Sequence, residues 1–311
     1  MHRINVHHHH MPPALVAPMQ KANLGNPLQF SWTPQKSIDD MDRSGTGISV
    51  LSVSLPVVAF LPRDEARRLA RDANDYAMRL VADHPGRFGA FATLPMPHVD
   101  DTLQEIAYAL DVLKMDGVCL LTSYGDRWLG DGAYAPVMDE LNRRGAVTFV
   151  HPNLPDCCAH TVPGIPPPVV EYGADTARAI TNLVFTGTSA RCAKVKFIFT
   201  HGGGAMPMFM DRYTNMSKLG GRFAEFTPDK VLAEFKRYYY DTALAANAPA
   251  MAALRQVAPI SQILFGTDFP FRVSDYQAAD LQDLFDAGEL KAIERENALR
   301  LMPGLRGRKA G

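Results

Sequence analysis

The chain has 311 residues, of which 47% are hydrophobic and 21% charged, a composition typical of a folded globular protein and not of a disordered one. Its 32 lysines and arginines nearly balance its 33 aspartates and glutamates, so no net field attracts nucleic acid, and a small-molecule partner is expected instead. Neither a signal peptide nor an apolar run of about 18 residues is visible, which predicts a cytoplasmic protein without membrane contact.

Short apolar runs alternate with longer segments of helical periodicity along the chain. This alternation is typical of parallel strands that are joined by helices. One helix is predicted from Arg63 to His84, and the next is predicted to begin at Asp100 or Asp101. The predicted strands are residues 4–8, 48–55, 88–94, 117–122, 146–151, 196–201, 238–242 and 262–268. Eight such units predict a single α/β domain over residues 1–311, folded as a (β/α)₈ TIM barrel.

Two segments look like insertions into this pattern. The first runs from Pro12 to Lys36, and the second is the proline-rich stretch from Pro152 to Pro168. Loops of this length in a compact domain are usually functional. Both are therefore predicted to lie over the carboxyl-terminal mouth of the barrel.

Chemically reactive side chains recur at the carboxyl ends of four predicted strands. They are His7, His8 and His9 in the first strand, His151 in the fifth, His201 in the sixth and Asp268 in the eighth. Because side chains alternate along a strand, His7 and His9 point the same way and can hold one ion, while His8 points away. The strand ends of a barrel converge on one mouth, so His151, His201 and Asp268 are expected to join them.

Imidazole nitrogens together with one carboxylate suit a divalent metal ion. Zinc is the first expectation, with manganese or iron as alternatives in a more open site. Such a set leaves a position free for water or substrate. The sequence therefore predicts one divalent ion at the barrel mouth.

Several motifs together resemble the amidohydrolase superfamily. The branch that they resemble contains aminocarboxymuconate-semialdehyde decarboxylase and the resorcylate and 6-methylsalicylate decarboxylases. The resemblance covers nearly the whole chain, and each motif alone is weak. The motifs are residues 4–9 with Pro12-Pro13, Val150-His151-Pro152, Thr200-His201-Gly202-Gly203, Tyr240-Asp241-Thr242 and residues 264–270.

The resemblance implies roles for the residues at the predicted mouth. His7, His9, His151 and Asp268 would ligate one metal ion, and His201 or Asp268 would carry the proton. A homodimer is typical of what this branch implies. One departure is Asn5, where the family usually has aspartate, and the missing charge would weaken the support of a histidine ligand.

Residues on the substrate side are predicted more loosely. A carboxylate substrate needs a cation, and Arg127 and Arg272 are basic residues near the predicted mouth; solvated surface charge is the alternative for both. Trp128 and Phe269 could line an aromatic pocket or could simply pack. Asp241 is predicted either to support a histidine ligand or to cap the helix that follows it.

The resemblance favours non-oxidative decarboxylation of an aromatic, salicylate-like, or conjugated carboxylic acid. The ligand set alone does not decide this, because the same ion could activate water. A metal-dependent hydrolase of a small lactone, ester or amide is therefore the alternative. A third interpretation is a catalytically silent barrel that binds a ligand.

Overall fold

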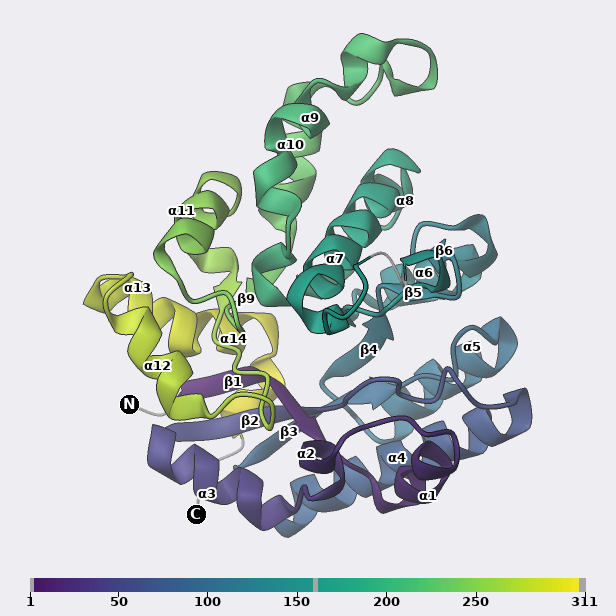
Figure 1. The fold of residues 1–311 in the computed structure, drawn as a ribbon, viewed down its shortest axis with the longest axis vertical. Helices are drawn as coiled ribbons and strands as arrows, with labels where there is room; N and C mark the ends of the chain where they lie inside the picture. The colour runs from purple at the N-terminus through teal and green to yellow at the C-terminus, as the bar shows by residue number, and fades with distance from the viewer. Residues whose placement is uncertain (1–2, 159–161, 308–311) are drawn as a thin grey trace.

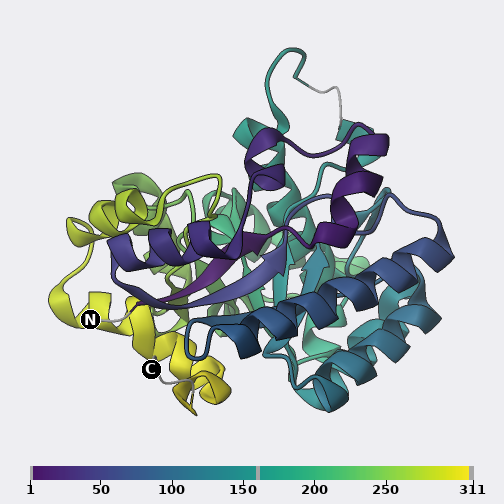
Figure 2. The ribbon, with the colours of Figure 1, turned by 90° about the horizontal axis from the view of Figure 1, so that it is seen from below.

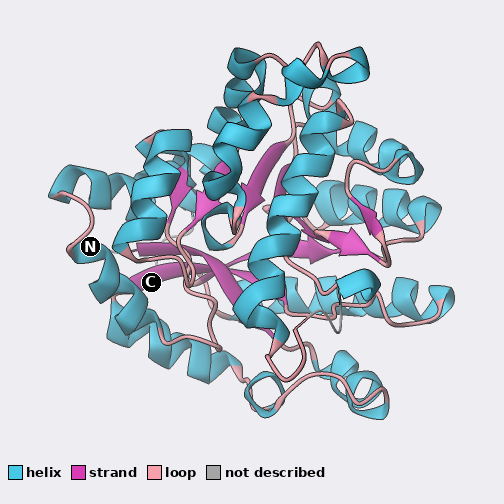
Figure 3. Cartoon of the chain, turned by 45° about the horizontal axis from the view of Figure 1, so that its top comes forward, coloured by secondary structure: helices cyan, strands magenta, loops and turns pink. Residues whose placement is uncertain are grey.

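The structure is a computed structural model that describes residues 3–158 and 162–307. Its centre is a nearly closed barrel of eight parallel strands, and helices surround it, as predicted (Figure 3). The strands in barrel order are β1 (Arg3–His10), β2 (Thr46–Val53), β3 (Phe88–Thr93), β4 (Gly117–Leu121), β7 (Val147–His151), β8 (Lys196–Phe199), β9 (Tyr239–Asp241) and β10 (Ile263–Leu264).

Helices connect the strands and cover the outside of the barrel (Figure 1). The predicted helix from Arg63 is α4, and it buries Leu69, Ala73 and Leu80 on one face. The α-helices are α1 (Pro13–Lys21), α2 (Pro27–Phe30), α3 (Pro34–Ser44), α4 (Arg63–Asp83), α5 (Val99–Ala107), α6 (Ala135–Arg144), α7 (Pro167–Phe185), α8 (Thr188–Arg191), α9 (Met210–Thr214), α10 (Pro228–Arg237), α11 (Ala248–Val257), α12 (Ser274–Gln282), α13 (Ala287–Lys291) and α14 (Asn297–Leu301). Within the described residues, no helix is both long enough and apolar enough to cross a membrane.

The first predicted insertion is helical and not an irregular loop. It contains α1 and α2 and ends in α3, and α1 lies beside α4 (Figure 2). Asn26 caps α2 by accepting hydrogen bonds from the backbone N–H groups of Leu28 and Gln29. In the second insertion, residues 159–161 lie outside the described residues. An antiparallel hairpin of β5 (Ser123–Tyr124) and β6 (Arg127–Trp128) follows β4 and was not predicted.

Strand β1 contains a break in register that positions the histidines. Its pairing with β2 shifts between Asn5 and His8, as in a β-bulge. Val6 belongs to the apolar cluster inside the barrel, and the His7 ring lies 5.0 Å from Phe149 of that same cluster. Strict alternation would turn one of two successive side chains outward, so the break is what lets both Val6 and His7 face inward.

The barrel closes between its first and last strands through a short seam. The backbone N–H of Val6 donates to the carbonyl of Phe265 (2.9 Å), and that of His9 donates to the carbonyl of Phe269 (2.8 Å). Strand β10 itself ends at Leu264, earlier than predicted. Beyond Leu264 the chain stays next to β1 through these two hydrogen bonds, but Asp268 has a φ of 68°, which no β-strand residue adopts, so regular pairing does not continue through it.

Candidate metal centre

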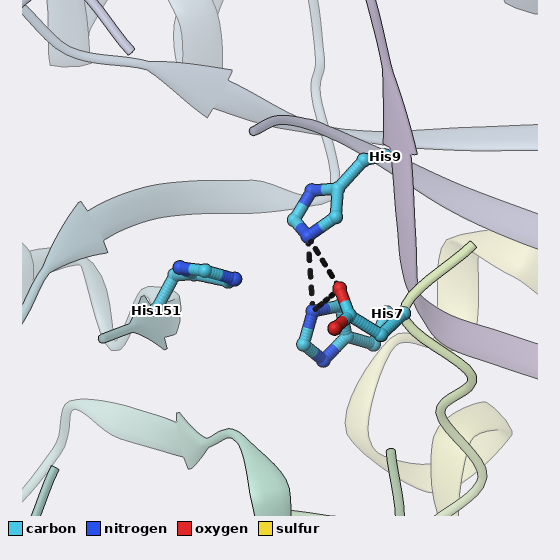
Figure 4. A group of neighbouring side chains, drawn as sticks. His7, His9 and His151 are labelled. Atoms are coloured by element: carbon cyan, nitrogen blue, oxygen red, sulfur yellow. Dashed lines mark hydrogen bonds and ion pairs between the residues drawn. The ribbon is translucent and has the colours of Figure 1, made fainter. Parts of the chain in front are cut away.

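Four side chains from the mouth of the barrel converge on one point. One ligand atom from each of His7, His9, His151 and Asp268 lies within 4.8 Å of the others, and all four residues are buried. The two histidines of β1 and the histidine at the end of β7 project into the same space (Figure 4). The barrel thus brings together residues that are more than 250 positions apart in sequence.

The donor atoms are spaced as ligand atoms around a small cation would be. The Nε2 atoms of His7 and His9 lie 3.1 Å apart, and Asp268 Oδ1 lies 3.2 and 3.1 Å from them. Ligands that bind an ion at about 2.0–2.2 Å lie roughly 3 Å from one another. Asp268 Oδ1 is buried and, among the described residues, meets the imidazole nitrogens of His7 and His9 as ion pairs without hydrogen-bond geometry, so a cation bound between these atoms would be a better partner.

Asp241 orients His7 from the side away from the cluster. Its Oδ2 lies 2.9 Å from Nδ1 of His7, and its Oδ1 accepts hydrogen bonds from the backbone N–H groups of His201 and Ala243, each at 3.0 Å. A carboxylate on the outer nitrogen fixes the ring and raises its basicity as a ligand. Of the two predicted roles of Asp241, support of a histidine is confirmed, whereas the helix that follows, α11, is capped by Asn247.

The other two histidines are held in a similar way. Nδ1 of His9 lies 3.0 Å from the hydroxyl of Ser52, and Nδ1 of His151 lies 2.9 Å from the carbonyl of Pro152. The carbonyl can only accept, so Nδ1 of His151 carries the hydrogen. The lone pair of Nε2 is then available to a metal ion.

His201 lies beside the four-residue cluster. Its ring is 5.0 Å from that of His7 and 5.9 Å from that of His151, and its Nδ1 donates to the carbonyl of Ala243. It forms a second possible ligand group with His7 and Asp241. The backbone of His201 has a φ of 54°, so the chain turns sharply where this ring enters the mouth.

The protonation of the cluster is strongly perturbed. Burial alone would lower the pKa of His7, but the carboxylates of Asp241 and Asp268 raise it to about 10. Burial would raise the pKa of Asp268, but the neighbouring His7 and His9 hold it well below its usual range. Burial lowers the pKa of His9 and, further, that of His151. Without a cation, one proton is therefore held on His7 between two carboxylates.

His8 and Asn5 face the other side of β1. The ring of His8 lies 2.8 Å from the hydroxyl of Ser37 and stacks on Phe269 at 4.5 Å. Asn5 bonds to the backbone of His7, because its Oδ1 accepts from the backbone N–H of that residue. The carboxylate beside the ring of His7 is that of Asp241, and the expected effect of Asn5 on metal affinity stays a prediction.

The residues predicted for the substrate side are dispersed. Arg127 is exposed on the hairpin, and the ring N–H of Trp128 donates to Asp175 at 2.7 Å. Phe269 is buried against His8, and Arg272 forms an ion pair with Asp280. Among the described residues, no side-chain hydrogen bond, ion pair or ring contact joins these four side chains to His7, His9, His151 or Asp268; Phe269 and Arg272 meet His9 and Asp268 through backbone hydrogen bonds alone. Their substrate-binding roles stay predictions.

Two aromatic residues that were not predicted lie against the cluster. The Phe271 ring is 5.9 Å from that of His9 and is 36% exposed, and the Tyr172 ring is 6.2 Å from that of His151. Burial and the charge of Asp268 raise the pKa of Tyr172 to about 12, so its hydroxyl is protonated at neutral pH. The position of Phe271 just after Asp268 was a usable signal, whereas Tyr172 comes from α7 and has no local signature.

Comparison with known proteins identifies relatives over the whole chain. The family model described as amidohydrolase matches residues 4–303. The chain is 33% identical to decarboxylase macB of Penicillium terrestre, over 98% of this chain and 96% of that protein. It is 32% identical to 6-methylsalicylic acid decarboxylase of Penicillium expansum, over 99% of this chain and 98% of that protein. The fold matches that of dihydroxybenzoic acid decarboxylase from Polaromonas sp. JS666, solved with manganese and 2-nitroresorcinol, with a TM-score of 0.86, 21% identity and 97% of each chain covered.

Proposed function

Because the chain belongs to the amidohydrolase family, and its relatives include decarboxylases of aromatic acids, we propose that it is a metal-dependent carboxy-lyase. Its substrate is an aromatic carboxylic acid of the salicylate type, with a hydroxyl next to the carboxylate. The observation that carries this proposal is the cluster of His7, His9, His151 and Asp268, in which a potential proton carrier is also a ligand. Decarboxylation without oxidation needs only a fixed substrate and a proton.

The four side chains fit a divalent cation. Three imidazoles and one carboxylate are typical ligands of zinc, and manganese, which the Polaromonas structure contains, is the alternative. The buried Oδ1 of Asp268, which meets His7 and His9 without hydrogen-bond geometry, supports this fit. When bound, the ion would act as a Lewis acid and as a fixed point for the oxygen atoms of the substrate.

The protein residues around this point account for the remaining steps. Phe271 and Tyr172 provide aromatic surface for the substrate ring, and the protonated hydroxyl of Tyr172 can donate to a substrate oxygen. Asp268 or His201 delivers a proton to the ring carbon that bears the carboxylate. A C–H bond then forms, the bond to the carboxylate breaks, and its electron pair returns to the ring. The net reaction consumes one proton and releases carbon dioxide.

Anaerobic turnover in D₂O tests this function directly. The metal-loaded protein should release carbon dioxide from a salicylate or resorcylate without an organic cofactor, and it should place one deuterium on the ring carbon. Uptake of solvent oxygen into an acid product from a lactone, ester or amide would instead identify a hydrolase. Metal binding without turnover of either substrate class would identify a barrel that only binds ligands.

A further inference from the structure

A chain of buried hydrogen bonds on the outer face of β1 leads to the turn that carries Asp268. The backbone N–H of Asp268 donates to the carbonyl of His7 at 2.9 Å, and its φ of 68° is a strained conformation for a non-glycine residue. Surrounding contacts must maintain such a conformation. Thr267, the residue before it, is buried and is the point where those contacts meet.

Both ends of the Asn5 side-chain amide have hydrogen-bond partners. Its Oδ1 accepts from the backbone N–H of His7 at 3.0 Å, which fixes which end of the amide is the oxygen. Its Nδ2 then donates to Thr267 Oγ1 at 2.8 Å and lies 3.3 Å from Nδ1 of His8. The amide therefore joins the bulge of β1 to the Asp268 turn across the seam of the barrel.

The far side of Thr267 is anchored as well. Its Oγ1 accepts from the backbone N–H of Phe269 at 3.3 Å and lies 3.4 Å from the hydroxyl of Ser274. The side chain and the backbone N–H of Ser274 both donate to Asp40, which is buried on α3. The turn is thus held between β1 on one side and α3 and α12 on the other.

We propose that Asn5 is a positioning residue for Asp268, which acts through Thr267, and that the site requires an amide at this position. An aspartate of the same shape could still accept from His7, but it has no hydrogen to give to Thr267 or His8 and places a charge in a fully buried space. The hydroxyl of Thr267 would then have to turn its own hydrogen toward the carboxylate and away from the carbonyl of His7, which lies 3.5 Å from it, and the turn would shift. This inference rests on the proposed role of Asp268 in the reaction.

A double-mutant cycle of Asn5→Asp and Thr267→Val tests the proposal. Each single variant should weaken Mn²⁺ binding, measured by calorimetry, or lower kcat by about ten- to a hundredfold, the usual effect of losing a partner of a ligand. KM should change much less. Because both changes break one path, the double variant should be about as impaired as the worse single variant.

Three controls complete the experiment. Thr267→Ser keeps the hydroxyl and should retain near-normal kcat and Mn²⁺ affinity. Asn26→Asp adds the same charge at the cap of α2, where a carboxylate accepts equally well, and should have no effect. If Asn5→Asp does not fold, the comparison of Thr267→Val with Thr267→Ser still tests the path from Thr267.

Multiplicative losses in the double variant, or Mn²⁺ affinity and kcat both unchanged in Asn5→Asp, would overturn the proposal. So would equal losses in Thr267→Val and Thr267→Ser. The Mn²⁺ measurements do not require turnover. If the protein decarboxylates no aromatic acid, the proposed function fails, while these binding data still decide whether Asn5 positions Asp268.

Discussion

Asp268 is the residue at which metal binding and proton transfer are proposed to meet. Its Oδ1 lies in the group of ligand atoms, and its backbone N–H donates a hydrogen bond to the carbonyl of His7. Asparagine keeps the size and one oxygen donor but cannot exchange a proton. Asp268→Asn should therefore keep a good part of its metal and lose about two to four orders of magnitude in kcat.

Metal analysis and steady-state kinetics on the same sample check this prediction. Substrate affinity should change far less than kcat. Nearly full turnover with metal retained would remove Asp268 from proton transfer and leave His201 as the donor. Loss of metal together with activity would make His201→Asn the next variant to measure.

The proton on His7 gives metal uptake a definite pH dependence. The two carboxylates raise the pKa of His7 from 6.5 to about 10, so below about pH 10 an incoming cation must displace that proton. The apparent affinity should rise about tenfold per pH unit from pH 7 to pH 9 and level off near pH 10. Calorimetry in two buffers with different ionisation enthalpies should count about one proton released. An affinity that is constant over this range would contradict the assignment.

At the scale of elements, the sequence predicted the strands well where apolar runs are bounded by turns. Strands β3, β4 and β7 begin and end within one residue of the prediction. The prediction was wrong after Leu264, because the turn at Asp268 depends on a bond to β1 that a local pattern does not contain. The bulge in β1 was not predicted either. Four successive histidines show no alternation from which a register could be read.

Helix α7 packs closely against the turn after His201, and adding one methyl group at Gly204 tests how much this contact matters. Gly204 has a φ of 61°, and a Cβ there would overlap the carbonyl of Gly173 on α7. Gly204→Ala should destabilise the fold by about 1–3 kcal/mol for the backbone and by a similar amount for the overlap. It should also lower kcat, because His201 lies on the same turn.

Gly220→Ala is the matched control for this prediction. Its φ of 68° is similar, but a Cβ there has no neighbour within 4 Å among the described residues. Only the backbone cost should remain, and kcat should be unchanged. Equal free energies of unfolding for the two variants, measured in urea, would show that the contact with α7 adds nothing.

At the scale of the whole molecule, the barrel explains why so much of the site could be predicted. Parallel strands converge at one mouth, so His7, His9, His151, His201 and Asp268 could be grouped from their places at predicted strand ends, and the family resemblance then separated the four ligands from His201. Tyr172 could not be grouped in this way, because its position depends on how α7 packs. The choice of zinc, the cytoplasmic location, the homodimer and the single domain over residues 1–311 stay predictions.

Metal binding should stabilise the entire barrel, because the ligands join its first and last strands. A divalent ion that binds only the folded chain, at 100 times its Kd, adds about 2.7 kcal/mol to the free energy of unfolding. Thermal unfolding with and without chelator should show this as a higher midpoint with metal. In His9→Ala the midpoint should no longer depend on the ion. Unfolding of His9→Ala in the absence of any metal would instead make this histidine structural.

The seam also determines when the centre can first exist. Asn5 and Thr267 meet across 262 positions of sequence, and the barrel closes only when the last strand reaches the first. During translation, His7 and His9 leave the ribosome before Asp268, their carboxylate partner, which follows on the order of tens of seconds later at 5–20 residues per second. For that interval the nascent chain carries a histidine pair without its carboxylate. The full set of four ligand side chains therefore exists only after the last strand has joined the first.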